Sequence, residues 1–451
     1  MSSLPLILAL DLGTSSFRSM LFRADGRAVR GSLQAIAVPE TAIGVMDPLL
    51  AAESVEELID ASSRQAAAMQ LPIAIVAMSC FWHSLLGVSR SGEPVTPVYL
   101  WSDPRSAPDA ADLRAELDCA TVQTRTGSSL HPVFWPAKLR WLRRTSPDLW
   151  READAWLSFG DYLYVRWLGR RQTSLSMASA TGLMDQARMD WDDELLRASH
   201  LNAKTLPRIV SQPASGATLA RGLDARWPAL QSALWLPAVG DGACSNLGVG
   251  AVLPDRWAVT VGTSAAVRAV LRDLPTRLPA GLWQYRIDAE RMVLGGALNN
   301  GGNVYEWLRQ MLRLPAAAAL EEELRERSWG NHRLTVDPSI FGERSPDWPL
   351  DASASIAGIT ARTSTVDIAQ ALLEAVAQRI AEIAGLMESA LGPPTSIVAT
   401  GGAMVKSAAW RGMLEHALGR PVAASKVRES SLRGAAQLAV EHLETGGNVA
   451  S

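Results

Sequence analysis

The sequence contains little cysteine, and its cysteines lack the spacing typical of disulfide-rich proteins or zinc sites. Three occur in 451 residues, and Cys80, Cys119 and Cys244 lie far apart in the chain. An odd number of cysteines without a Cys-x-x-Cys pair argues against both a disulfide framework and a zinc site. The composition therefore favours the reducing environment of the cytoplasm.

A large charge excess and a long apolar run are also missing. The formal net charge is −3, with 20% charged residues, so the composition gives no reason to expect nucleic acid or an anionic membrane as a partner. The N-terminal apolar stretch LPLILAL meets Asp11 after seven residues, which is too short for a membrane span. We expect this stretch to form a buried strand.

The sequence does contain the same short turn twice. LALDLGTSS (8–16) and WAVTVGTSA (257–265) both end an apolar run in Gly-Thr-Ser. Such a turn points backbone N–H groups and small hydroxyls outward, where they suit phosphate oxygens. One copy alone is more typical of a plain hairpin. Two copies at matching positions indicate a pair of loops that grip a polyphosphate.

Only the first turn carries an acid. Asp11 stands two residues before the glycine, and Thr260 has this place in the second copy. We expect Asp11 to hold a metal ion, directly or through water, while the second loop needs donors only. The expected phosphate contacts come from the residues of the two turns, which are Gly13, Thr14, Ser15, Gly262, Thr263 and Ser264.

Two glycine-rich segments add chemistry of other kinds. In GDGACSNLGVGA (240–251), Asp241 lies between two glycines. It is either the cap of the helix that follows or a general base for a hydroxyl that attacks phosphorus, and both interpretations stay open. In ATGGAMVKSAAW (399–410), a strand ends in Gly401 and Gly402 and a helix opens, which could pack a flat adenine. Alone, that turn is very common.

Hydrophobic periodicity predicts an α/β protein of two domains, the second beginning near residue 240. We expect a buried strand over 5–12, then two more strands joined at Asp25-Gly26, a helix from residue 55 and another strand over 73–80. A helix over 135–150 should stop at Ser146-Pro147. Later helices are expected at 316–327, at 365–391 and from Ser407.

The order of these segments resembles the FGGY family of carbohydrate kinases, in the actin, hexokinase and sugar-kinase superfamily. The resemblance covers the whole length. Its collinear segments are LDLGTSS, TVGTSAAVR, DGACSNLGVGA, FGERSPDW, ATGGAMVKSAAW and the final helix segment ESSLRGAA. It implies two actin-like (ribonuclease H-like) α/β domains around a central cleft. Residues 1–239 would carry the sugar side and the first phosphate loop, and residues 240–451 the nucleotide side.

The resemblance also implies the roles of single residues. ATP would lie with its adenine over Gly401 and Gly402 and its phosphates at the two loops, with Gly301 also on the nucleotide side. Mg²⁺ would be held near Asp11, and Asp241 would be the general base.

The sugar side resembles gluconokinases more than xylulokinases, through RTGSSLHPVFWPAKLRWL and the Ser-Asn-Leu-Gly-Val and Asn-Asn-Gly-Gly strings. D-gluconate is the substrate this implies, with 6-phosphogluconate as product. The implied substrate contacts are Trp82, His83, Trp101, Asp103, Arg105, His131 and Asp241. Two positions depart from the family pattern: Ala265 stands where glycine is expected, and Phe81-Trp82 stand where relatives often have Gln-Met.

Other interpretations remain. Both histidines could be structural, and Asp103 and Arg105 could form an ordinary turn pair. Lys406 could lie near the nucleotide, although a solvated side chain is more typical of a lysine. The protein could phosphorylate xylulose or another pentulose, bind sugar and nucleotide as a silent regulator, or form actin-like filaments. The expected partners are a small sugar or sugar acid and ATP, with a homodimer as one option and neither nucleic acid nor membrane.

Overall fold

The structure is a computed structural model that describes residues 5–38, 44–211, 219–275 and 277–445. The chain forms two compact units. Unit 1 consists of Met1–Gly250, Tyr285–Met292 and Glu429–Ser451, and unit 2 of Ala251–Gln284 and Val293–Arg428. The expectation that the second domain begins near residue 240 stays a prediction. The compact units divide the chain differently, because two segments from beyond residue 250 group with unit 1.

A mixed sheet forms the centre of unit 1, in the order β13-β5-β1-β2-β3, with β14 also paired to β5. Strand β1 is antiparallel to β2 and parallel to β5. Every residue of β1 and β5 is buried, which explains why both strands are apolar along most of their length rather than alternating, with Asp11 and Ser79 close to their ends. The bounds are β1 Leu6–Leu12, β2 Ser16–Arg23, β3 Gln34–Ala37, β5 Ile73–Cys80, β13 Leu234–Trp235 and β14 Val239–Gly240.

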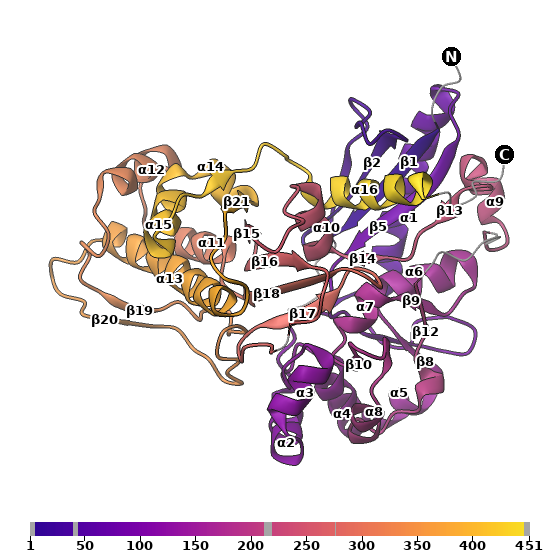
Figure 1. The fold of residues 1–451 in the computed structure, drawn as a ribbon, viewed down its shortest axis with the longest axis horizontal. Coiled ribbons are helices and arrows are strands. Elements are labelled where there is room, and N and C mark those ends of the chain that lie inside the picture. The colour runs from indigo at the N-terminus through magenta and orange to yellow at the C-terminus, as the bar shows by residue number, and fades with distance from the viewer. Residues whose placement is uncertain (1–4, 39–43, 212–218, 276, 446–451) are drawn as a thin grey trace. The chain divides into compact units, whose positions relative to one another are not determined.

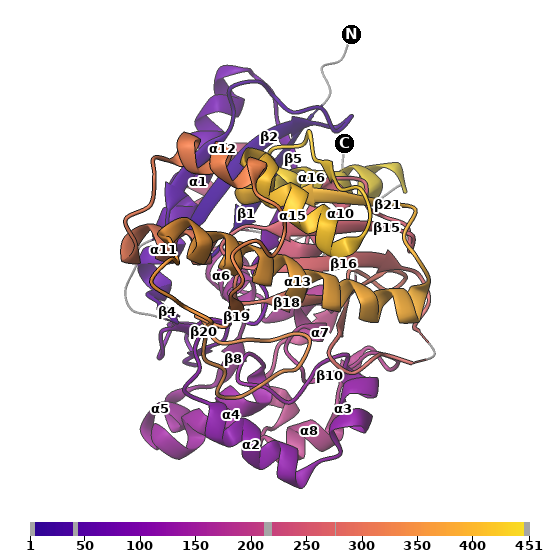
Figure 2. The same ribbon diagram turned by 90° about the vertical axis from the view of Figure 1, so that its left-hand side faces the viewer.

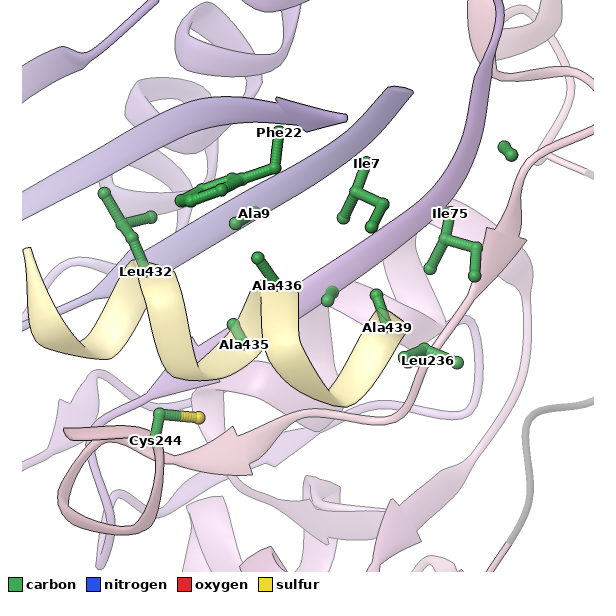
Figure 3. Close-up of a cluster of buried hydrophobic side chains, with 12 residues drawn as sticks. Ile7, Ala9, Phe22, Ile75, Leu236, Cys244, Leu432, Ala435, Ala436 and Ala439 are labelled. Carbon is green, nitrogen blue, oxygen red and sulfur yellow. The ribbon is translucent and has the colours of Figure 1, made fainter. Parts of the chain in front are cut away.

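The C-terminal helix α16 (Ser430–Glu444) packs on this sheet and on α10 (Asp241–Gly248) (Figure 1). Figure 3 shows its small apolar face turned toward the side chains of β1, β2 and β5. The residues in this cluster include Ile7, Ala9, Phe22, Ile75, Leu432, Ala435, Ala436 and Ala439. Helix α1 (Pro48–Ala68) packs against β2 and β3.

Helices α10 and α16 touch backbone to backbone. A Cβ placed on Gly434 would lie 1.9 Å from the carbonyl oxygen of Cys244, and one on Gly248 would lie 1.9 Å from that of Ser430. No side chain larger than hydrogen fits at either position. The glycine of the final helix is therefore required by the contact that fixes α10, the helix that begins at Asp241.

The remainder of unit 1 contains seven helices between residues 107 and 198: α2 Ala107–Glu116, α3 Cys119–Thr126, α4 Trp135–Thr145, α5 Pro147–Glu152, α6 Phe159–Leu168, α7 Leu175–Ser179 and α8 Asp193–Ala198. Short strands pair there as β4 (Val45–Met46) with β7 (Val98–Tyr99), β6 (Leu86–Val88) with β8 (Ala155–Leu157), β9 (Gln172–Ser174) with β12 (Arg208–Val210), and β10 (Met184–Asp185) with β11 (Asp190–Trp191). Helix α4 ends at Thr145, as expected, because Pro147 starts a new helix at its first turn.

Unit 2 contains a second mixed sheet, in the order β17-β18-β16-β15-β21-β22. Strand β15 is antiparallel to β16 and parallel to β21. The long helix α13 lies across β16 and β18, beside α15 (Figure 2). The strands are β15 Arg256–Val261, β16 Ala265–Leu271, β17 Trp283–Arg286, β18 Met292–Leu298, β21 Ser396–Thr400 and β22 Ala423–Ala424; the helices are α11 Gly302–Met311, α12 Ala317–Glu326, α13 Thr365–Leu391, α14 Gly402–Lys406 and α15 Ala408–Leu418.

The predicted α/β class is confirmed, and one local expectation is wrong. After the turn at Asp25-Gly26 the chain makes a single bridge, between Phe22 and Ala28, and the third strand begins only at Gln34. The intervening Gly31 has φ of +76°, which breaks an extended strand. Within the described residues, no helix has the length and apolar character needed to cross a membrane.

Candidate functional site

Asp11 lies near the end of β1 in a polar cluster within unit 1. The Ser79 hydroxyl donates a 2.9 Å hydrogen bond to Oδ1, and Nη1 of Arg18 lies 3.9 Å from Oδ2. The same guanidinium donates to Glu429 at 3.2 Å. Burial raises the pKa of Asp11 to about 7; the charges of Asp241 and Glu429 add to this, while Ser79 and Arg18 oppose it.

This donor set fits a magnesium ion. In the described part of the chain, no group of three or more His, Cys, Asp or Glu side chains could hold a metal by itself. Mg²⁺ does not need such a group, since it is usually bound by one or two carboxylates together with water and substrate phosphates. A cation beside Asp11 would favour the ionised form of a carboxylate that burial otherwise keeps close to protonation.

The two Gly-Thr-Ser turns form similar hairpin ends. The Gly13 N–H donates to the Ser16 carbonyl at 3.1 Å, and the Gly262 N–H to the Ser264 carbonyl at 3.0 Å. Thr14 is partly exposed, whereas Ser15 and Thr263 are exposed, so both tips are open to a ligand. The departure at Ala265 is harmless, because this residue begins β16 and has no positive φ.

Asp241 is the first residue of α10, and Gly240 is the N-cap without a side-chain bond. Oδ1 of Asp241 accepts the N–H of Gly242 at 2.7 Å, so the side chain bonds an N–H of the first helical turn although Asp241 is not itself the N-cap. The negative charge of Asp241 also contributes to the raised pKa of Asp11. The two carboxylates therefore interact electrostatically within unit 1.

Trp82 and His83 are buried in an aromatic cluster of unit 1. The indole Nε1 donates to the Ser176 carbonyl at 3.2 Å, and the ring meets Tyr285 edge-on at 5.1 Å. His83 has φ of +66°, and its Nδ1 lies 2.7 Å from the Ala180 carbonyl oxygen. Because a carbonyl oxygen only accepts, Nδ1 carries the proton of the neutral ring.

His131 has the opposite tautomer. Its Nδ1 accepts the Val133 N–H at 3.3 Å, so the proton of the neutral ring is on Nε2. Lys138 connects this segment to the other predicted sugar segment, because Nζ donates to the backbone oxygens of Pro132 (2.7 Å) and Asp103 (3.2 Å). Burial lowers the pKa of Lys138 to about 8.

Asp103 and Arg105 bond to one another rather than standing apart. Oδ2 of Asp103 lies 2.6 Å from Nη2 of Arg105, and Oδ1 accepts both Nε and the backbone N–H of that residue. The guanidinium is 4.5 Å from the ring centre of Trp141. This arrangement agrees with the turn-pair interpretation. Trp101, in the same segment, is partly buried.

Unit 2 contains a cavity of about 700 Å³ on the expected nucleotide side. Gly262, Thr263 and Gly402 line it. Gly301 and Gly401 support the second turn from behind. A Cβ on Gly301 would lie 2.5 Å from the carbonyl carbon of Ser264, and one on Gly401, where φ is +86°, would lie 2.3 Å from the Val261 oxygen.

Apart from Lys406, the remaining walls of this cavity were not singled out by the sequence analysis. Its apolar lining includes Ala317, Ala318, Leu320, Leu324, Leu373 and Trp410, and its polar lining includes Asn303, Tyr305, Glu306, Glu321, Lys406 and Ser407. The signal available was the run of alanines that opens the helix at 316–327, because small side chains leave room beside a helix end. Lys406 is exposed and lines the cavity.

Contacts within unit 1 link most of the predicted sugar-side residues to the segment that holds Asp241. Phe134 stacks edge-on to His83 at 5.2 Å, and its N–H donates to the His131 carbonyl. Gly240, beside Asp241, lies against the Trp82 indole. Arg18, Ser79, Glu429 and Lys138 are further polar residues of unit 1 that the sequence analysis did not single out.

Comparisons with known proteins cover both units. The model of the FGGY family of carbohydrate kinases, N-terminal domain, matches residues 6–248, and that of the C-terminal domain matches residues 257–441. A gluconokinase of Bacillus subtilis (strain 168) is 28% identical over 452 residues, covering 95% of this chain and 86% of the relative.

Two solved structures are also similar over almost the whole chain. Gluconate kinase from Lactobacillus acidophilus has a TM-score of 0.88 at 27% identity, covering 99% of this chain and 91% of that one. Ligand-bound xylulose kinase from the same organism has a TM-score of 0.89 at 26% identity, with the same coverage.

Proposed function

Because the chain belongs to the FGGY family of carbohydrate kinases, we propose that it transfers the γ-phosphoryl group of ATP to a primary hydroxyl of D-gluconate, giving 6-phosphogluconate. The observation that carries the proposal is the pair of carboxylates in unit 1. Asp241 begins a helix whose position α16 fixes, and its charge reaches the buried carboxylate of Asp11. In this proposal Asp241 accepts the proton of the attacking hydroxyl and Asp11 binds the metal ion.

Asp241 would act as the general base. A primary hydroxyl is a weak nucleophile at neutral pH, and a carboxylate aligned with it accepts the proton as the oxygen–phosphorus bond forms. The bond to the Gly242 N–H holds Oδ1.

Asp11 would hold Mg²⁺, with Ser79 orienting its carboxylate. When bound, the ion neutralises charge on the phosphate oxygens during transfer. The chain's own contribution is to bury the carboxylate and to keep a second cation, Arg18, within 4 Å of it. This side chain is bonded to Glu429 at the same time.

The cavity of unit 2 would bind the nucleotide. Its leucines and Trp410 suit a flat apolar base, and Thr263 at its edge offers a hydroxyl and an N–H to the phosphates. Lys406 is also on the lining, where a cation favours a polyphosphate. All three cysteines are free thiols, and we propose the cytoplasm as the compartment.

The choice of gluconate depends on the likeness to gluconokinases, which are similar over almost the whole chain. The likeness to xylulose kinase supports a pentulose as the second candidate.

A substrate panel tests the proposal. ADP release would be measured with Mg·ATP and D-gluconate, D-xylulose or glycerol, and the product identified by mass. We expect the highest kcat/KM for gluconate. A preference for xylulose or glycerol would overturn the substrate and leave the kinase in place. ADP release that no sugar raises above the rate without sugar would favour the silent regulator.

A further inference from the structure

The peptide that precedes Asp241 is held from two sides within unit 1. Gly240 ends β14 and is the N-cap of α10. A Cβ on Gly240 would lie 1.8 Å from Cε2 and 2.0 Å from Nε1 of the Trp82 indole. The side of the indole that carries Nε1 and Cε2 therefore occupies the place of a side chain at Gly240, and no larger residue fits there.

The other side is held by α7. The hydroxyl of Ser176 accepts the Gly240 N–H at 3.1 Å. The carbonyl oxygen of the same residue accepts Nε1 of Trp82 at 3.2 Å. One buried serine thus bonds both the peptide before Asp241 and the ring that packs on that peptide, so a shift of either group would strain the other.

Neighbouring contacts make this arrangement stiff. Ser176 is fully buried and Trp82 is 5% exposed. The Ser174 hydroxyl, two residues before Ser176, donates to the Ala238 carbonyl and accepts the Met177 N–H. Residues 238 and 240 are therefore both bonded to serines of the 174–176 segment, and the strand cannot slide without breaking both bonds.

We propose that Ser176 and Trp82 are positioning residues that set the place of the Asp241 carboxylate for proton transfer. Neither needs to touch the substrate to do so. The inference depends on the proposed function, because it requires Asp241 to be the base. It explains why an aromatic ring stands at position 82 and why glycine stands at position 240: the two are complementary surfaces.

A buried N–H that loses its acceptor seeks another one, and the backbone at Gly240 shifts with it. Proton transfer needs heavy atoms within hydrogen-bond reach, and a misplacement of about 1 Å can lower a rate by about 10²-fold. Substrate contacts made by other residues would remain, so KM should change little.

Ser176→Ala is the first test, with Ser32→Ala as the matched control. Ser32 is also fully buried, and its hydroxyl accepts the Leu21 N–H and donates to the Val29 carbonyl. We expect both variants to lower the melting temperature. Only Ser176→Ala should lower kcat, by about 10- to 10²-fold, with KM for sugar and for ATP nearly unchanged.

A double-mutant cycle separates positioning from a general structural effect. In the Asp241→Asn background no proton is transferred to residue 241, so Ser176→Ala should cost almost nothing further in kcat. Equal losses of kcat in both backgrounds would overturn the positioning role. If Asp241→Asn alone keeps the native kcat, the base assignment fails, and the inference fails with it for that separate reason.

Trp82→Phe provides a second variant in case Ser176→Ala does not fold. Phe removes the Nε1 donor and part of the surface against Gly240 but keeps an aromatic ring. We expect lower kcat in the native background and no further loss in the Asp241→Asn background. A rise in sugar KM with unchanged kcat would instead make Trp82 a wall of the sugar pocket and overturn its positioning role.

Discussion

The Ser79 hydroxyl donates a hydrogen bond to Asp11 from the directly paired position of the neighbouring parallel strand. Unit 2 repeats this arrangement. Thr400 pairs with Thr260 on parallel strands, and its hydroxyl donates to that of Thr260 at 2.8 Å. The two halves therefore place a hydroxyl donor at the same register, and only the first half presents a carboxylate to it.

This difference leads to the first prediction, for Asp11→Asn. The amide keeps an acceptor for Ser79 but carries no charge to hold a cation. We expect the Mg²⁺ concentration for half-maximal rate to rise strongly and kcat to fall, while sugar binding measured by calorimetry changes little. Asp25→Asn, in the exposed turn after the next strand, is the control and should leave the Mg²⁺ dependence unaltered. An unchanged Mg²⁺ requirement in Asp11→Asn would remove the metal role.

The second prediction concerns Asp241→Asn. Asn keeps the shape and can still accept the Gly242 N–H, but it cannot take a proton. General-base help is worth about 10²–10⁴ in rate, so kcat should fall by about that factor with ATP and sugar binding retained. Because Asn caps a helix about as well as Asp, the melting temperature should stay near native. Near-native kcat would leave Asp241 with the capping role alone.

Local patterns in the sequence predicted much of the fold but little of what supports the site. The strand at 73–80 and the helix at 365–391 agree with the structure to the residue, because burial and periodicity are local signals. The contacts of Gly434 with α10 and of Ser176 with Gly240 join segments far apart in the chain. Nothing in a single segment encodes its distant partner, so such contacts become visible only in the folded chain.

The third prediction follows from one of these contacts. In Gly434→Ala the new methyl would meet the Cys244 carbonyl oxygen at 1.9 Å, and α10 and α16 would have to move apart. Overpacking of this kind typically costs about 1–3 kcal/mol, and kcat should fall as well because α10 begins at Asp241.

Gly385→Ala is the matched control for this helix-to-helix contact. Gly385 lies in α13, and a Cβ there meets nothing within 4 Å. Alanine is the better helix former by about 0.5–1 kcal/mol, so this variant should be slightly more stable than the native protein. Urea unfolding of both variants measures the difference. Equal effects in the two variants would show that the contact between α10 and α16 does not limit stability.

The last prediction is a pH dependence of stability that comes from Asp161. This buried residue closes the capping box of α6, where its Oδ2 accepts the Ser158 hydroxyl at 2.7 Å. Burial raises its pKa from 3.8 to about 7, and the hydrogen bonds from Ser158 and Thr173 oppose that rise without cancelling it. Because folding favours the protonated acid, the stabilising contribution is fully present below the unfolded pKa. It is lost as pH rises through about 7.

Comparison with Asp161→Asn isolates this contribution, since Asn keeps the acceptor and does not titrate. The unfolding free energy of the native protein minus that of the variant should fall by about 1.4 kcal/mol per pH unit between about pH 5.5 and 7, then level off. Urea unfolding across that range measures it, and other titrating groups such as Asp11 cancel in the difference.

Asp367→Asn is the matched control. Asp367 closes the same kind of box on α13 beside Ser364, but there the hydrogen bonds from Ser364 and the charge of Arg327 outweigh burial and lower its pKa. The unfolding free energy of the native protein minus that of Asp367→Asn should not change with pH from about pH 5.5 upward, because the Asp367 carboxylate is ionised in both the folded and the unfolded chain. A flat difference for Asp161→Asn as well would show that the Asp161 carboxyl group ionises at its ordinary pKa.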